Sequence, residues 1–171
     1  MAMLGKEVRM SRLVNPKSNK MMAITVDHAI SRGIAPMTGL HHIQDTIDKI
    51  ILGKPDAMTM TKGIAEHCMW NHAGDVSMLM KISNYSPAAP TNDTVFGTVD
   101  EAIRMGADAV SMGAMTLGDF QGEQFERIGK VAEECMAKGM PLIGHVYPKG
   151  ESVPVDKRTA WENIAYCVRS A

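Results

Sequence analysis

The stretch "TVDEAIRMGADAVSM", residues 98–112, contains a helix start, a helix stop and a strand in direct succession. Thr98 followed three positions later by Glu101 is a capping-box pattern, which predicts a helix that runs into Arg104. Gly106 suits the left-handed residue that ends a helix, and "DAVSM" (108–112) is typical of a buried strand. The stretch therefore predicts a helix that ends at a glycine and leads at once into a strand.

The same order recurs along the chain. "GKPDAM" (53–58) has nearly the form of "GADAV" (106–110), and Gly139 precedes "MPLIG", so we expect left-handed helix ends at Gly53, Gly106 and Gly139. Successive parallel strands need crossover helices, and the pattern therefore predicts an α/β protein with a parallel sheet. The predicted strands cover residues 21–26, 56–60, 76–83, 108–112 and 141–147.

Two architectures share this pattern, the doubly wound sheet and the (β/α)8 barrel. The chain has no G-x-G-x-x-G after its first strand and no G-x-x-x-x-G-K-[ST], which favours the TIM barrel. Only about five βα units are present, whereas a closed barrel has eight in about 250 residues. We expect residues 1–171 to be one domain, the N-terminal portion of a TIM barrel, with the rest of the barrel outside them.

Composition disfavours several classes of partner. Eighteen Lys and Arg stand against 19 Asp and Glu, and the net charge of -1 offers no positive surface for nucleic acid or a membrane. The three cysteines are widely spaced, which favours free thiols in a reducing compartment. With no signal-like start and no apolar run of transmembrane length, we expect a cytoplasmic protein.

Polar side chains stand where the predicted strands end. In "ITVDHA" (24–29) the apolar run stops at Asp27 and His28. Functional groups of parallel α/β proteins gather at the carboxyl ends of the strands, although any one of these residues could be an ordinary turn residue. The other candidates are Lys62, Lys81, His145, Tyr147 and Lys149.

This mixture of a carboxylate, a phenol and amines suits proton transfer beside a carbonyl better than acyl transfer. An amine whose pKa is lowered by burial can form a Schiff base with a ketone, and spacing nominates Lys62 and Lys81. Lys81 alternates in phase with Ser77 and Leu79, which favours an inward direction.

Three segments carry a resemblance to a known family: "MSRLVNPKSNKMMAITVDHAISRG" (10–33), "TVDEAIRMGADAVSMG" (98–113) and "GMPLIGHVYPKG" (139–150). In order and spacing they are similar to the archaeal-type class I fructose-bisphosphate aldolases, with the related aminodideoxyheptulosonate synthases and phospho-autoinducer thiolases. The resemblance runs from about Gly5 to Ala171. It implies a (β/α)8 barrel, a homo-oligomer, a phosphorylated ketose as substrate, and chemistry without metal or other cofactor.

Residue by residue, the resemblance places the family's catalytic aspartate on Asp27 and its catalytic tyrosine on Tyr147. It implies that Asp27 assists the carbinolamine and proton-transfer steps and that Tyr147 is the general acid/base. The substrate-binding candidates are His28, Lys62, Lys81 and Lys149. Ala29 replaces the family's usual glycine, and the family's Schiff-base lysine belongs to a sixth strand that lies beyond Ala171, so we expect these 171 residues alone to be inactive.

Two rival hypotheses remain. "EHCMWNH" (66–72) concentrates Glu66, His67, Cys68 and His72, which raises a metal-dependent hydrolase or class II-type aldolase, but the spacing is not that of a recognised metal site. The non-enzymatic rival is a partial barrel that serves as a subunit or binding module.

Overall fold

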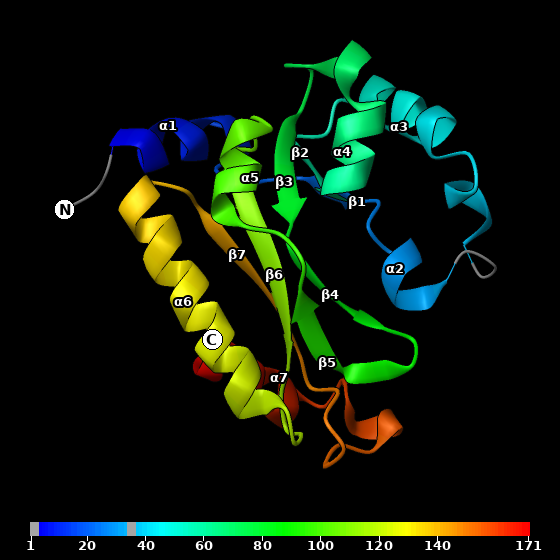
Figure 1. The fold of residues 1–171 in the computed structure, drawn as a ribbon, viewed down its shortest axis with the longest axis vertical. Coiled ribbons are helices and arrows are strands. Elements are labelled where there is room, and N and C mark those ends of the chain that lie inside the picture. Colours follow the sequence, from blue (N-terminus) through cyan, green and yellow to red (C-terminus); the bar gives the residue numbers. More distant parts are fainter. Residues whose placement is uncertain (1–3, 34–36) are drawn as a thin grey trace.

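The computed structural model describes residues 4–33 and 37–171 (Figure 1). The predicted domain, residues 1–171, thus includes residues 1–3 and 34–36, which lie outside the described part. Five parallel strands form the main sheet in the order β1-β2-β3-β6-β7. Their bounds are β1 Ala23–Thr25, β2 Ala57–Thr61, β3 Ser77–Lys81, β6 Ala109–Met115 and β7 Leu142–Tyr147. The predicted parallel α/β architecture is confirmed.

Helices connect and cover these strands, and α6 runs along β6 (Figure 1). The α-helices are α1 Leu4–Leu13, α2 Ala29–Arg32, α3 Ile43–Leu52, α4 Lys62–Cys68, α5 Val99–Arg104, α6 Gln121–Lys138 and α7 Trp161–Ser170. The short 3-10 helices are η1 Thr38–Leu40, η2 Trp70–His72 and η3 Val155–Lys157. In the part of the chain that the structure describes, no helix has the length and apolarity to cross a membrane.

Alternation along the strands separates two apolar layers. Successive strand residues point to opposite faces, so Met58, Met80 and Met112 lie on the helix-covered face, where they belong to the main core. On the other face, Ala57, Leu79 and Ala109 cluster with Leu13 of α1 near the amino ends of the strands. Lys81 follows Leu79 on this second face, farther toward the carboxyl ends.

The helix ends match the sequence predictions with one exception. Thr98 and Glu101 form a full capping box at the start of α5, and Gly106 and Gly139 have φ angles of 78° and 61°. Gly53, however, has φ -76°, and the left-handed residue there is Lys54 with φ 51°. The predicted left-handed end at Gly53 is therefore wrong by one position, because the helical turn continues through the glycine.

A second sheet was not predicted. The hairpin β4 (Ser83–Ser86) and β5 (Ala89–Val95) follows β3 directly, so the strand predicted over 76–83 is too long. In Figure 1 this hairpin lies at the end of the sheet opposite α1. The turn-rich sequence "SPAAPTN" (86–92) conceals it, because prolines and polar residues weaken a strand signal.

The C-terminal helix α7 exposes large apolar side chains. Trp161 and Val168 are 75% and 74% exposed. Cys167 packs inward instead and lies 3.1 Å from the Thr116 hydroxyl, measured from Sγ to Oγ1.

Candidate active site

A cavity of about 180 Å³ opens at the carboxyl ends of the parallel strands. Asp27 follows β1, Lys81 ends β3, and Tyr147 ends β7, so three separate strands deliver these side chains to one place. The alternation that directs Leu79 toward α1 also directs Lys81 into this cavity. The full lining is Thr25, Asp27, His28, Ser31, Arg32, Lys81, Asn84, Tyr85, Asp93, His145, Tyr147 and Lys149.

Asp27 lies just beyond the carboxyl end of β1. Its side chain is 13% exposed, and its Oδ1 lies 3.9 Å from Nδ1 of His28. The Asn84 amide donates to its Oδ2 at 3.4 Å, a long and weak hydrogen bond. The carboxylate therefore keeps much of its capacity to accept further hydrogen bonds from a ligand.

Tyr147 lines the same cavity as Asp27. Burial raises the pKa of Tyr147, and the negative charges of Asp27 and Asp93 raise it further, whereas Arg32 lowers it. The phenol therefore stays protonated at neutral pH, the state in which it can donate a proton.

Lys81 is the most deeply buried cation of the cavity, with 4% exposure. Burial lowers the pKa of its amine, while Asp93 and Asp27 act to raise it. Next to it, burial and the charge of Lys81 lower the pKa of His145 to about 4, so this imidazole is neutral at pH 7. His145 Nε2 is buried without a hydrogen-bond partner among the described residues, which leaves an unsatisfied polar atom in the wall.

Lys149 and Tyr85 form a cation–π pair in the wall of the cavity. The Lys149 ammonium lies 4.0 Å from the centre of the Tyr85 ring, within cation–π range. Burial raises the pKa of Tyr85, but the hydrogen bond and charge of Lys149, together with Ser31 and Arg32, outweigh it, and the net pKa is lowered. Positive charge thus gathers on this side of the cavity.

The structure brings together six of the seven candidate residues. The cavity is lined by Asp27, His28, Lys81, His145, Tyr147 and Lys149, while Lys62 lies elsewhere. As the first residue of α4, Lys62 forms an ion pair with Glu101 of α5 at 3.0 Å. We therefore leave Lys62 out of the proposed substrate site, because it has the parity of Met58 and Met60, which lie on the helix-covered face of β2.

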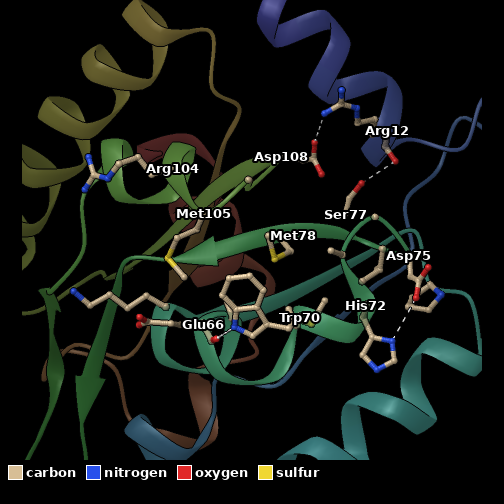
Figure 2. Close-up of a pocket in the computed structure, with 18 of the residues that line it drawn as sticks. Arg12, Glu66, Trp70, His72, Asp75, Ser77, Met78, Arg104, Met105 and Asp108 are labelled. Atoms are coloured by element: carbon tan, nitrogen blue, oxygen red, sulfur yellow. Dashed lines mark hydrogen bonds and ion pairs between the residues drawn. The ribbon is translucent and has the colours of Figure 1, made fainter.

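Lys62 instead lines a larger groove of about 1060 Å³ beside α4 and α5 (Figure 2). Its polar walls are largely paired with one another: Arg12 with Asp108 at 3.0 Å, and the Trp70 indole N–H with the Glu66 carbonyl oxygen at 2.6 Å. We assign the chemistry to the smaller cavity, because that cavity lies at the carboxyl ends of the strands and contains the buried titratable groups.

Sequence reasoning missed several wall residues. Asn84, Tyr85 and Asp93 come from the unpredicted hairpin, so no strand-end pattern marked them. His145, by contrast, is one of the strand-end candidates from the sequence, and it lies on the same face of β7 as Tyr147.

The metal hypothesis finds no support in the geometry. His72 hydrogen-bonds through Nε2 to Asp48 at 2.7 Å, and Cys68 is buried in the core. Among the residues that the structure describes, no group of three or more His, Cys, Asp and Glu side chains could hold a metal ion.

A parallel sheet curved into a half-barrel, with a carboxylate, an amine and a phenol at the carboxyl ends of its strands, defines an α/β protein of partial-barrel fold. Residues 21–170 match the model of a family described as DeoC/LacD family aldolase, and the chain belongs to this family.

Curated relatives agree. The chain is 31% identical over 159 residues to 2-amino-3,7-dideoxy-D-threo-hept-6-ulosonate synthase 1 of Archaeoglobus fulgidus, an alignment that covers 92% of this chain and 58% of that protein. It is 26% identical over 160 residues to a fructose-bisphosphate aldolase class 1 of Halobacterium salinarum, with 91% and 60% coverage. The chain thus spans about three fifths of the length of these relatives.

Solved structures show the same fold. An archaeal fructose 1,6-bisphosphate aldolase superposes with a TM-score of 0.81 at 23% identity, over 96% of this chain and 65% of that one. The comparisons therefore confirm the predicted α/β fold with a parallel sheet and the predicted resemblance to class I aldolases.

Proposed function

We propose that this chain forms the first five βα units of a class I, Schiff-base aldolase that makes or breaks a carbon-carbon bond in a phosphorylated ketose. The observation that carries the proposal is the meeting of Asp27, Lys81 and Tyr147 in one cavity of a chain that belongs to an aldolase family. Relatives of greater length support a complete (β/α)8 barrel that continues beyond these residues.

In the proposed mechanism, the Schiff-base lysine lies outside residues 1–171. The iminium that it forms with the ketose carbonyl accepts the electron pair of the breaking carbon-carbon bond. Tyr147, which its raised pKa keeps protonated, exchanges a proton with the substrate oxygen, and Asp27 assists formation of the carbinolamine and its dehydration. His28, Lys81 and Lys149 bind the oxygens of the substrate.

Trapping experiments test this proposal. The complete protein is incubated with dihydroxyacetone phosphate, reduced with borohydride and mapped by mass spectrometry. We expect one covalent adduct on a lysine that follows Ala171. An adduct on Lys81 would move the nucleophile into this chain, and the absence of any adduct would refute the Schiff-base mechanism.

The same family offers a second reaction. The relative of Archaeoglobus fulgidus is named an aminodideoxyheptulosonate synthase, and Ala29 in place of the usual glycine changes the space beside Asp27. Product analysis with fructose 1,6-bisphosphate and alternative carbonyl acceptors would separate the two activities. We further propose a cytoplasmic homo-oligomer, which sedimentation of the complete protein would test.

The non-catalytic rival makes the opposite prediction. If the chain is a partial-barrel subunit or binding module, the gene ends at Ala171 and the purified protein forms no adduct. A continuing reading frame with a lysine-bearing strand soon after Ala171 would support the aldolase.

A further inference from the structure

Asp93 is a buried carboxyl group in the cavity wall with an unsatisfied oxygen. It lies in β5, is 3% exposed and lines the cavity that contains Lys81. Its Oδ1 atom is buried and has no hydrogen-bond partner within residues 4–33 and 37–171. Burying a carboxylate is costly unless a nearby charge or donor compensates for it. The structure must therefore supply such a compensation inside the cavity.

A buried side chain of α6 connects the hairpin that carries Asp93 to the main sheet. Gln124 of α6, 1% exposed, accepts hydrogen bonds at Oε1 from the backbone N–H groups of Asp93 and Met115, each at 3.0 Å. Its Nε2 donates to the carbonyl oxygens of Thr91 and Met115 at 3.2 and 3.3 Å. One amide thus links β5 to β6 and fixes the backbone position of Asp93.

The carboxyl group itself is seated on a glycine. A Cβ atom at Gly113 of β6 would lie 2.3 Å from Asp93 Oδ2. Ser83 accepts the Gly113 N–H at 2.8 Å, and its hydroxyl donates to the Asp93 carboxyl group. The absence of a side chain at Gly113 therefore creates the space in which Asp93 approaches the cavity floor.

Lys81 is the buried cation that lines the same cavity as Asp93. Burial lowers the pKa of the Lys81 amine, and Asp93 is the strongest of the groups that oppose this. Burial likewise raises the pKa of Asp93, and the Ser83 hydrogen bond, followed by the charges of Lys81 and Arg127, counteracts it. Lys81 and Asp93 make no direct salt bridge, so their interaction acts through space. The groups that face Lys81 are Asp27 from the end of β1, Tyr85 from β4, Asp93 from β5 and His145 from β7.

We propose that Asp93 is a positioning residue of this cavity, which holds Lys81 as the cation at its floor. This inference rests on the proposed aldolase function in one respect: the phosphorylated ketose is the ligand that the Lys81 ammonium would contact. Three features fix the position of the Asp93 carboxyl group: the Gln124 amide, the space at Gly113 and the Ser83 hydroxyl. The hairpin that carries Asp93 therefore contributes to the function of the cavity.

Trace acetylation with acetic anhydride across a pH series, read by mass spectrometry, tests the inference without any aldolase substrate. Asp93→Asn keeps the shape of the side chain and removes its charge. The pH at which Lys81 becomes half-reactive should fall by about 1 unit, because an opposite charge nearby favours the ammonium form. Exposed Lys17 is the internal reference and should not change. An unchanged midpoint for Lys81 in folded Asp93→Asn protein would refute the inference.

A second variant displaces the carboxyl group without removing its charge. Gly113→Ala pushes Asp93 away and should move the Lys81 midpoint in the same direction, whereas Gly129→Ala, with open space around its Cβ position, should not. If neither cavity variant folds, the unaltered protein decides: the Lys81 ammonium should give a protected ¹⁵N–¹H correlation at neutral pH, and its absence would overturn the inference. Failure of borohydride trapping would refute the aldolase proposal alone and leave these results standing.

Discussion

Asp27 and Tyr147 line one cavity although Asp27 follows β1 and Tyr147 ends β7, the two edge strands of the five-stranded sheet. The two side chains also interact electrostatically, because the charge of Asp27 is the second-largest cause of the raised pKa of Tyr147, after burial. A flat sheet would hold its edge strands about 19 Å apart, given about 4.8 Å between neighbouring strands. The shared cavity therefore reflects the curvature of a half-barrel, and it unites groups that sequence alone could only place at separate strand ends.

Removal of the Tyr147 hydroxyl should abolish most turnover in the complete enzyme. Tyr147→Phe should lower kcat by roughly 10²- to 10⁴-fold, the range for loss of a general acid/base. Steady-state kinetics with fructose 1,6-bisphosphate would measure it. Tyr166→Phe is the matched control, because that phenol bonds to Gln121 outside the cavity, and equal losses in both variants would contradict the assignment.

Gly113 and Gly129 should respond oppositely to alanine. Gly113→Ala should destabilise the protein by about 1–3 kcal/mol, because the new methyl group collides with the buried Asp93 carboxyl group. Gly129→Ala, in the middle of α6 with open space, should stabilise it by about 0.5–1 kcal/mol. Urea denaturation would measure both changes in the free energy of unfolding. An unchanged free energy for Gly113→Ala would mean that the hairpin moves to accommodate the methyl group at little cost.

Loss of the Gln124 amide should loosen the hairpin. Gln124→Met keeps the bulk but leaves backbone groups of Asp93, Thr91 and Met115 without their partner, at a cost of about 1–3 kcal/mol for each group that stays buried. Hydrogen exchange at the Asp93 and Met115 amides should accelerate. Glu123→Met, one position earlier on the exposed face of α6, should leave these amides protected.

His72 should make stability depend on pH. The hydrogen bonds that the His72 ring donates to Asp48 and Asp75 raise the pKa of His72, although burial opposes them, so folding favours the imidazolium. Its contribution is fully present below the unfolded pKa of about 6.5 and is lost as pH rises through the higher folded pKa. His72→Gln should therefore lower Tm more at about pH 5.5 than at about pH 9. Equal losses at both values would exclude this linkage.

The native protein should resist thiol reagents. Cys68, Cys135 and Cys167 are all free and buried, and burial raises the pKa of Cys135 to about 11. Because the thiolate is the reactive species, a chromogenic disulfide reagent should label almost nothing at pH 8 in the folded state. All three thiols should react after denaturation in guanidinium. Rapid labelling of Cys135 under native conditions would indicate frequent local opening beneath α6.

The sequence by itself determined the βα repeat, the capping box at Thr98 and the resemblance to class I aldolases. These features arise from contacts a few residues apart along the chain, so they are legible in apolar spacing and in single glycines. It also indicated that Asp27, Lys81 and Tyr147 lie at strand ends, because the parallel order of the strands brings their carboxyl ends to the same side of the sheet.

Only the tertiary structure decided that Lys62 leaves the site, that the hairpin brings Asp93 and Tyr85 into it, and that Gly113 gives the Asp93 carboxyl group its place. Each of these depends on side chains that are distant in sequence, such as Gln124 with Asp93 and Lys62 with Glu101. Curvature of the sheet and burial of charge are properties of the assembled fold, and no local pattern encodes them.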